Sequence, residues 1–151
     1  MSNDETLRKL DRMVGRWTTE ATHPAMPGVV VHGTLTVEWL EGDTFLIQRS
    51  TTDHPDFPHA IAILGFTGAE TAGAVKDAAR LTMQYFDSRG VHRVYEAAVD
   101  AAGLRISIDA GGMAQRITYT FVGDDRIEGR AKMREGDQTW RDDLAIDCRR
   151  A

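Results

Sequence analysis

The chain has 151 residues, of which 42% are hydrophobic and 27% are charged, a composition typical of one folded domain. Its formal net charge of −5 disfavours nucleic acid and anionic membranes as main partners. The single cysteine, Cys148, excludes an internal disulfide and a cysteine-built zinc site. No apolar run approaches the length of a membrane span and no secretory leader is visible, so we expect one cytoplasmic domain over residues 1–151.

The N-terminal segment has the pattern of one short amphipathic helix. Ser2 and Asn3 are candidate N-caps. The apolar positions that follow recur at helical spacing: Leu7, Leu10, Met13 and Val14. Gly15 ends the helix because glycine tolerates positive φ, and Trp17 then brings a large apolar surface that needs burial.

After Gly15 the period of the hydrophobic pattern changes from about 3.6 residues to 2 and stays there. Ten stretches with this pattern are predicted strands: 16–23, 29–40, 44–52, 61–66, 80–86, 91–99, 104–110, 115–122, 126–134 and 139–149. The stretch 67–78 is loop-like. Several of the turns are too short for the crossovers of a parallel sheet, and a two-sheet sandwich would need more long loops. The prediction is an all-β, antiparallel, up-and-down barrel of about ten strands with a short N-terminal helix.

The start of the first strand carries a recognisable signature. Gly15-Arg16-Trp17 after a short helix resembles the signature of the calycin superfamily, which includes lipocalins, fatty-acid-binding proteins and nitrobindins. Three further segments are similar to uncharacterised lipocalin-like bacterial proteins related to nitrobindins: Trp39-Leu40-Glu41-Gly42, Asp56-Phe57-Pro58 and Tyr85-Phe86-Asp87-Ser88-Arg89-Gly90-Val91. The likeness spans nearly the whole chain.

The resemblance implies a calycin-like barrel closed at one end by Gly15, Trp17 and an arginine of the last strand. That arginine packs over the tryptophan in a cation–π contact. We assign this structural role to Arg149, with Arg150 as the neighbouring alternative.

Nitrobindins hold a haem iron through a histidine on the final strand, usually followed by leucine. The comparable position here is Asp143, followed by Leu144, and no histidine lies beyond His92. The second glycine after the tryptophan is also absent, since Thr18-Thr19 follow it. The sequence therefore disfavours haem, and no cofactor is expected.

A barrel of eight to ten strands can leave room for a small ligand. If the large apolar residues mark the inner face, six polar or aromatic side chains share it: Arg49, Tyr85, Arg93, Tyr95, Tyr119 and Trp140. Arginine offers forked donors to a carboxylate, and tyrosine places a hydroxyl on an apolar body. The alternative is that Arg93 pairs with Asp142 or lies outside, because a register error of one residue moves every side chain to the other face.

The segment 53–59 combines two prolines with histidines and carboxylates. We interpret it as a portal loop at the barrel mouth, with His54, Phe57 and His59 as its characteristic residues. A divalent metal is the alternative, but the spacing matches no strong metal motif, so no metal ligand is assigned. His23 and His32 lie near the same rim, as acid–base candidates or as surface residues.

These observations predict a protein that binds a small, largely apolar ligand with an acidic or carbonyl group in the barrel lumen. An isomerase- or cyclase-type enzyme is the alternative, with tyrosine or histidine moving a proton and arginine stabilising an oxyanion. Haem binding through His23, His54 or His59 is a third hypothesis. The only partner expected is the small molecule, with no nucleic acid or membrane, and the protein is expected to be a monomer or a homodimer.

Overall fold

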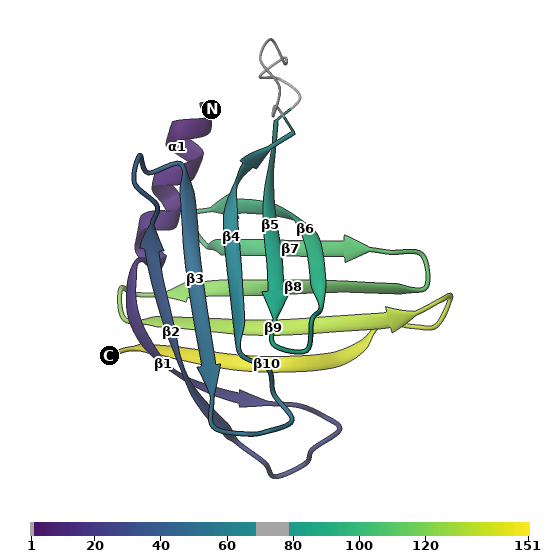
Figure 1. Ribbon diagram of the computed structural model, residues 1–151. Helices are drawn as coiled ribbons and strands as arrows, with labels where there is room; N and C mark the ends of the chain where they lie inside the picture. Colours follow the sequence, from purple (N-terminus) through teal and green to yellow (C-terminus); the bar gives the residue numbers. More distant parts are fainter. Residues whose placement is uncertain (1, 69–78) are drawn as a thin grey trace.

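The ten predicted strands are all present, and they close into an antiparallel barrel (Figure 1). The computed structural model describes residues 2–68 and 79–151. The strands are β1 (Gly15–Thr22), β2 (Val31–Trp39), β3 (Phe45–Thr52), β4 (Ala60–Thr67), β5 (Arg80–Asp87), β6 (His92–Asp100), β7 (Gly103–Asp109), β8 (Met113–Val122), β9 (Arg126–Glu135) and β10 (Arg141–Arg150). Of the predicted loop 67–78, Thr67 ends β4, and residues 69–78 lie outside the described part of the chain.

Each strand pairs with its neighbours in sequence, and β1 pairs with β10 to close the circle. This order confirms the up-and-down barrel and rules out the two-sheet sandwich. Because β1 starts at the end that the helix covers, the loops after β1, β3, β5, β7 and β9 all lie at the opposite, open end. Within the described residues, no helix is long and apolar enough to cross a membrane.

The predicted N-terminal helix is confirmed as α1 (Asn3–Arg8), which continues as the 3₁₀ helix η1 (Lys9–Met13). Ser2 is the N-cap, since its side chain accepts a hydrogen bond from the backbone N–H of Glu5 at 3.1 Å. The buried face of the two helices packs on the barrel core and comprises Leu7, Leu10 and Met13. The helices therefore cover one end of the barrel.

Trp17 is the largest fully buried side chain at this closed end. Its indole N–H donates to the carbonyl oxygen of Met13 at 2.9 Å, which ties the strand to the helix. The guanidinium of Arg150 lies over the indole, 4.2 Å from its centroid. The same guanidinium donates to the backbone carbonyls of Val14, Arg12 and Asp124.

The assignment of the closing arginine to Arg149 is wrong, and the register explains why. Arg150 is the residue directly opposite Trp17 in the β1–β10 ladder, whereas Arg149 is opposite Thr18. Side chains alternate between faces along a strand, so only Arg150 can reach the indole. Gly15 has a φ of +136°, and a Cβ there would lie 2.5 Å from Nη1 of Arg150, so both the backbone and the arginine require glycine.

Replacing Arg150 by methionine is expected to lower the free energy of unfolding by about 2–3 kcal/mol, because three carbonyls lose a charged donor. Arg149→Met is the matched control, since in the described structure the Arg149 side chain makes no hydrogen bond or ion pair. It should change stability by less than about 0.5 kcal/mol. Urea unfolding of both variants measures the difference, and equal losses would contradict this account of the closed end.

Candidate functional site

The barrel is hollow, with an internal cavity of about 590 Å³. Short side chains on the inner faces of neighbouring strands leave this space unfilled: Thr19 and Ala21 on β1, Ser50 on β3, and Ala60 and Ala62 on β4. Most of the lining surface is apolar, and Met13 of η1 lies at its closed end. The cavity thus suits a molecule with an apolar body.

Four of the six predicted lumen residues do line the cavity: Tyr85, Arg93, Tyr95 and Tyr119. They lie on β5, β6 and β8, and burial alternates regularly along β6 and β8. The rings of Tyr85 and Tyr95 meet edge to face, with centroids 6.4 Å apart. These four side chains thus lie where the sequence predicted, and their role in ligand binding stays a prediction.

The predicted inward orientation of Arg49 is wrong. Its side chain is exposed on the outer face and lies 3.6 Å from the carboxylate of Glu38. Strand β3 carries apolar residues on both faces, because Ile47 pairs outside with Ile63 while Leu46 is buried inside. The hydrophobic pattern of β3 therefore does not distinguish its two faces.

Trp140 is also outside the lumen, contrary to prediction. Its ring lies between two guanidinium groups, with Arg116 at 3.9 Å and Arg134 at 5.0 Å from the centroid. The alternative pair of Arg93 with Asp142 is absent too, because Asp142 forms an ion pair with Lys132 at 3.0 Å.

A β-bulge in β10 accounts for both errors. Asp142 pairs with Lys132 and Ala145 pairs with Arg130, so Asp143 and Leu144 together face one residue of β9. The bulge shifts the alternation by one position, and both of its residues line the cavity. Asp143 thereby points into the lumen, a placement that simple alternation does not predict.

Asp143 ends a chain of hydrogen bonds that begins at Arg93. Nη1 of Arg93 donates to the Tyr95 hydroxyl at 3.4 Å, and this hydroxyl donates to Oε1 of Gln115 at 2.7 Å. Nε2 of Gln115 then donates to Oδ2 of Asp143 at 2.8 Å. Sequence reasoning missed Gln115, although it is in phase with Tyr119 on β8.

The other carboxylate oxygen of Asp143 is bonded to His23, with Nε2 and Oδ1 2.8 Å apart. Nδ1 of His23 accepts the backbone N–H of Ala25 at 3.0 Å. An imidazole nitrogen that accepts a hydrogen bond carries no proton, so Nε2 holds the proton and donates it to Asp143. Both ring nitrogens of His23 are therefore engaged.

A second polar cluster lies at the rim, in the turn between β5 and β6. The Asp87 carboxylate is fully enclosed and accepts from Tyr85 and from both Nε and Nη2 of Arg89. The hydrogen bonds from Arg89 hold the pKa of Asp87 well below its usual range. Burial, with the hydrogen bond to Asp87, raises the pKa of Tyr85 far above its ordinary value.

Several polar groups of the cavity lack a protein partner among the described residues. The Tyr119 hydroxyl makes no hydrogen bond, and burial raises the pKa of this phenol, so it stays a neutral donor. The amide nitrogen of Gln48 is enclosed without a partner. Arg93 forms only its bond to Tyr95 and no ion pair. A ligand oxygen in the lumen would satisfy such donors.

The predicted portal loop lies between β3 and β4, at the open end. Phe57 lines the cavity there and packs edge to face on His54, with ring centroids 5.7 Å apart. His54 and His59 do not line the cavity, and His59 contacts the backbone oxygen of Thr52 at 3.3 Å. Across residues 2–68 and 79–151, no group of three histidine, cysteine or acidic residues is placed to hold a metal ion.

Comparisons with known proteins support the fold. A family model described as "Protein of unknown function (DUF1579)" matches residues 4–150. The crystal structure of Rv2717c from M. tuberculosis is similar over 97% of both chains, with a TM-score of 0.65 and 15% identity. The S-type phycobiliprotein lyase CPES from Guillardia theta is similar over 100% of this chain and 93% of its own, with a TM-score of 0.57 and 10% identity. No curated protein matches the sequence.

Tyr95→Phe is expected to lower the free energy of unfolding by about 1–2 kcal/mol, because it leaves the half-buried Oε1 of Gln115 without its donor. Tyr119→Phe is the matched control, since that hydroxyl has no partner in the described structure. It should cost less than about 0.5 kcal/mol. Chemical denaturation of the two variants compares these losses, and a larger loss for Tyr119→Phe would refute the hydrogen-bond chain.

Asp87→Asn tests the rim cluster by its pH dependence. A carboxyl group whose pKa is depressed in the folded state stabilises the protein above its unfolded pKa of about 3.9, and this stabilisation is lost as the pH falls. The wild type should therefore lose stability between about pH 5 and pH 2 more steeply than the variant does. Thermal unfolding across that pH range measures both curves, and parallel curves would contradict the prediction.

Proposed function

The chain belongs to the DUF1579 family, and from the lumen of this member we propose that the protein binds a small, largely apolar molecule bearing an acidic or carbonyl group. The observation that carries the proposal is the cavity of about 590 Å³, whose largely apolar lining is interrupted by donors that lack protein partners in the described structure. Burial of the apolar body of the ligand would stabilise the complex by roughly 25 cal/mol per Å² of apolar surface removed from water.

Arg93 is the residue we assign to the acidic or carbonyl oxygen. Its guanidinium lines the cavity, and its one hydrogen bond to Tyr95, at 3.4 Å, leaves most of its donors free. Charge-assisted hydrogen bonds between guanidinium and carboxylate are among the stronger polar contacts in proteins. Tyr119, as a neutral donor, would add a second contact suited to a carbonyl oxygen.

The closed end supports the calycin-like assignment, because Arg150 covers Trp17 as the resemblance implies. Haem binding in the nitrobindin manner does not fit the residues of the cavity. The final-strand position holds Asp143, whose two carboxylate oxygens accept from Gln115 and His23. His23 is the one described histidine that lines the lumen, and both of its nitrogens are already bonded.

The enzyme alternative is less well supported by the same residues. An isomerase needs a group that readily exchanges a proton near neutral pH. Burial raises the pKa values of Tyr85 and Tyr119, so these hydroxyls stay protonated. The Tyr95 proton is directed to Gln115, and that of His23 to Asp143. These arrangements favour binding over proton transfer.

The test compares two fluorescent probes that share an apolar body and differ in charge: 1-anilinonaphthalene-8-sulfonate and the uncharged N-phenyl-1-naphthylamine. Arg93→Met should weaken the sulfonate probe about 10- to 100-fold, the loss expected for a hydrogen bond to a charged group, because only that probe needs the guanidinium. The uncharged probe should change by less than about threefold. Fluorescence titration of the folded protein gives both dissociation constants.

Arg49→Met is the matched control, since it removes an arginine from the outer face of the same barrel. It should leave both probes unaffected. Failure of the wild-type protein to bind either probe would overturn the proposed function. Equal weakening of both probes by Arg93→Met would overturn the role of its charge.

A further inference from the structure

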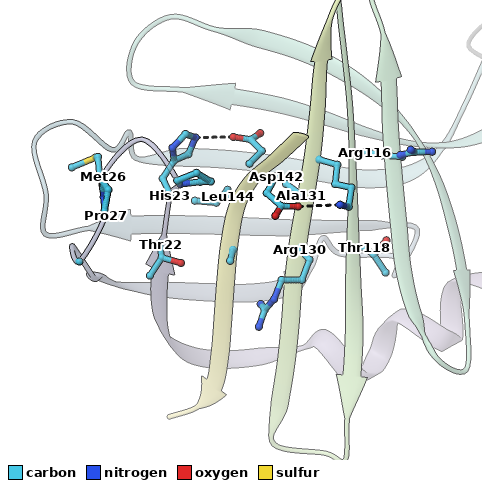
Figure 2. A pocket seen from close by; sticks show the side chains of 15 residues that line it. Thr22, His23, Met26, Pro27, Arg116, Thr118, Arg130, Ala131, Asp142 and Leu144 are labelled. Carbon is cyan, nitrogen blue, oxygen red and sulfur yellow. Dashed lines mark hydrogen bonds and ion pairs between the residues drawn. The ribbon is translucent and has the colours of Figure 1, made fainter. Parts of the chain in front are cut away.

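A groove of about 610 Å³ lies on the outside of the barrel, between the loop after β1 and strands β8 to β10 (Figure 2). Met26 and Pro27 of the loop form one side, and Arg116, Thr118 and Arg130 lie on the strands. Four residues line both this groove and the internal cavity: His23, Met26, Asp143 and Leu144. The two spaces therefore adjoin at the His23–Asp143 pair, which Figure 2 shows as a dashed line.

The sheet is interrupted where the two spaces meet. The β9–β10 ladder is regular up to the pair of Asp142 with Lys132 and resumes at Ala145 with Arg130. Between these pairs the bulge residues Asp143 and Leu144 are out of register. The β1–β10 ladder ends nearby, at the pair of Thr22 with Ala145, so beyond this pair the side chains of His23 and Asp143 lie between the lumen and the groove.

The loop over the groove is attached weakly to the rest of the barrel. In the described structure, the backbone hydrogen bonds of residues 24–28 are local. The N–H of Met26 donates to the carbonyl oxygen of His23 at 2.9 Å, the N–H of Val29 donates to that of Met26 at 3.2 Å, and the N–H of Ala25 donates to the His23 ring. Among the described residues, one hydrogen bond links this loop region to β10, that of His23 with Asp143. His23 retains 33% of its side-chain exposure, so solvent reaches the pair from outside.

The barrel mouth is held more firmly. The Thr52 hydroxyl donates to the carbonyl oxygen of Phe57 at 3.0 Å. The backbone N–H of Phe57 donates to the carbonyl oxygen of His54 at 3.1 Å, which forms a turn within the loop. The loop 53–59 is therefore bonded to its surroundings at Thr52 and, through His59, at Ser88, whereas in the described structure one side-chain hydrogen bond joins the region of loop 24–28 to β10.

We propose that the outer groove is a lateral entrance to the lumen and that the His23–Asp143 hydrogen bond is its latch. The entering molecule is the largely apolar, acidic ligand of the proposed function, and its identification rests on that proposal. The entrance itself does not depend on that function.

Cys148 provides a built-in reporter of access, because this single cysteine lines the lumen and is 2% exposed. The experiment measures its rate of modification by the neutral reagent 4,4′-dithiodipyridine in the intact protein. Burial raises the pKa of the thiol to about 12, so the reaction is slow and its rate reports on how often the reagent reaches the lumen.

His23→Ala is expected to raise this rate about 5- to 10-fold, because loss of one hydrogen bond can increase the fraction of molecules with an open entrance by about this factor. Asp143→Ala should raise it similarly, and the double variant should be no faster than the faster single variant, because both remove the same bond. His32→Ala, at an exposed histidine of the adjacent strand, is the matched control and should leave the rate unchanged.

Phe57→Ala tests the competing route through the mouth and should accelerate the reaction less than His23→Ala does. An unchanged rate in His23→Ala, or a greater acceleration in Phe57→Ala, would overturn the proposal. Urea unfolding of each variant gives its loss of global stability and thus the increase in thiol modification that global unfolding alone would cause. If the measured increase is no larger than this expected one, the proposal is overturned. Because no ligand is used, failure of the entrance is distinguishable from failure of the proposed function.

Discussion

The pairing of β1 with β10 is the constraint on which the rest of the structure depends. It joins the two ends of the chain and turns an open sheet into a barrel without edge strands. Arg150 stabilises this junction through the indole of Trp17 and through three carbonyl groups that lie far away in sequence. With the helices over one end, the inner faces of ten strands are removed from solvent, and a cavity can persist between them.

The side chains that line a hollow barrel lack van der Waals contacts that they would make in a filled core. Here the small side chains Ala21, Ala60 and Ala62 leave the space, and polar side chains from several strands interrupt its lining. Gly129 contributes to the same arrangement, because a Cβ there would lie 2.9 Å from the ring of Tyr119. The absent side chain lets this tyrosine lie close to β9 and keeps the lumen free.

The sequence predicted the fold well, since a strict period of 2 between short turns has few solutions other than an antiparallel barrel. It also placed Tyr85, Arg93, Tyr95 and Tyr119 on the cavity side, and burial alternates regularly along β6 and β8, which carry three of these residues. Arg49 was misplaced since β3 is apolar on both faces, and Trp140 because the bulge changes the phase of β10. A bulge depends on pairing with a distant strand and leaves little trace in local pattern.

The choice of Arg149 over Arg150 failed for a related reason. Two adjacent arginines are equivalent in sequence, and only the register against β1 distinguishes them. Gln115 was missed as a site residue because it belongs to no motif, and Asp143 was considered only as the residue that stands at the haem-histidine position. Their roles depend on the hydrogen bond between them, which connects β8 and β10 across the intervening strand β9.

The hydrogen-bond chain from Arg93 to Asp143 has a direction. Each member donates to the next, so the bond dipoles of the Tyr95 hydroxyl and the Gln115 amide are aligned between a cation and an anion. Neither group can reverse alone without placing two donors or two acceptors against each other. The two charged ends thus fix the orientation of the neutral members between them, and the barrel interior carries a built-in polarity along which a bound molecule would be aligned.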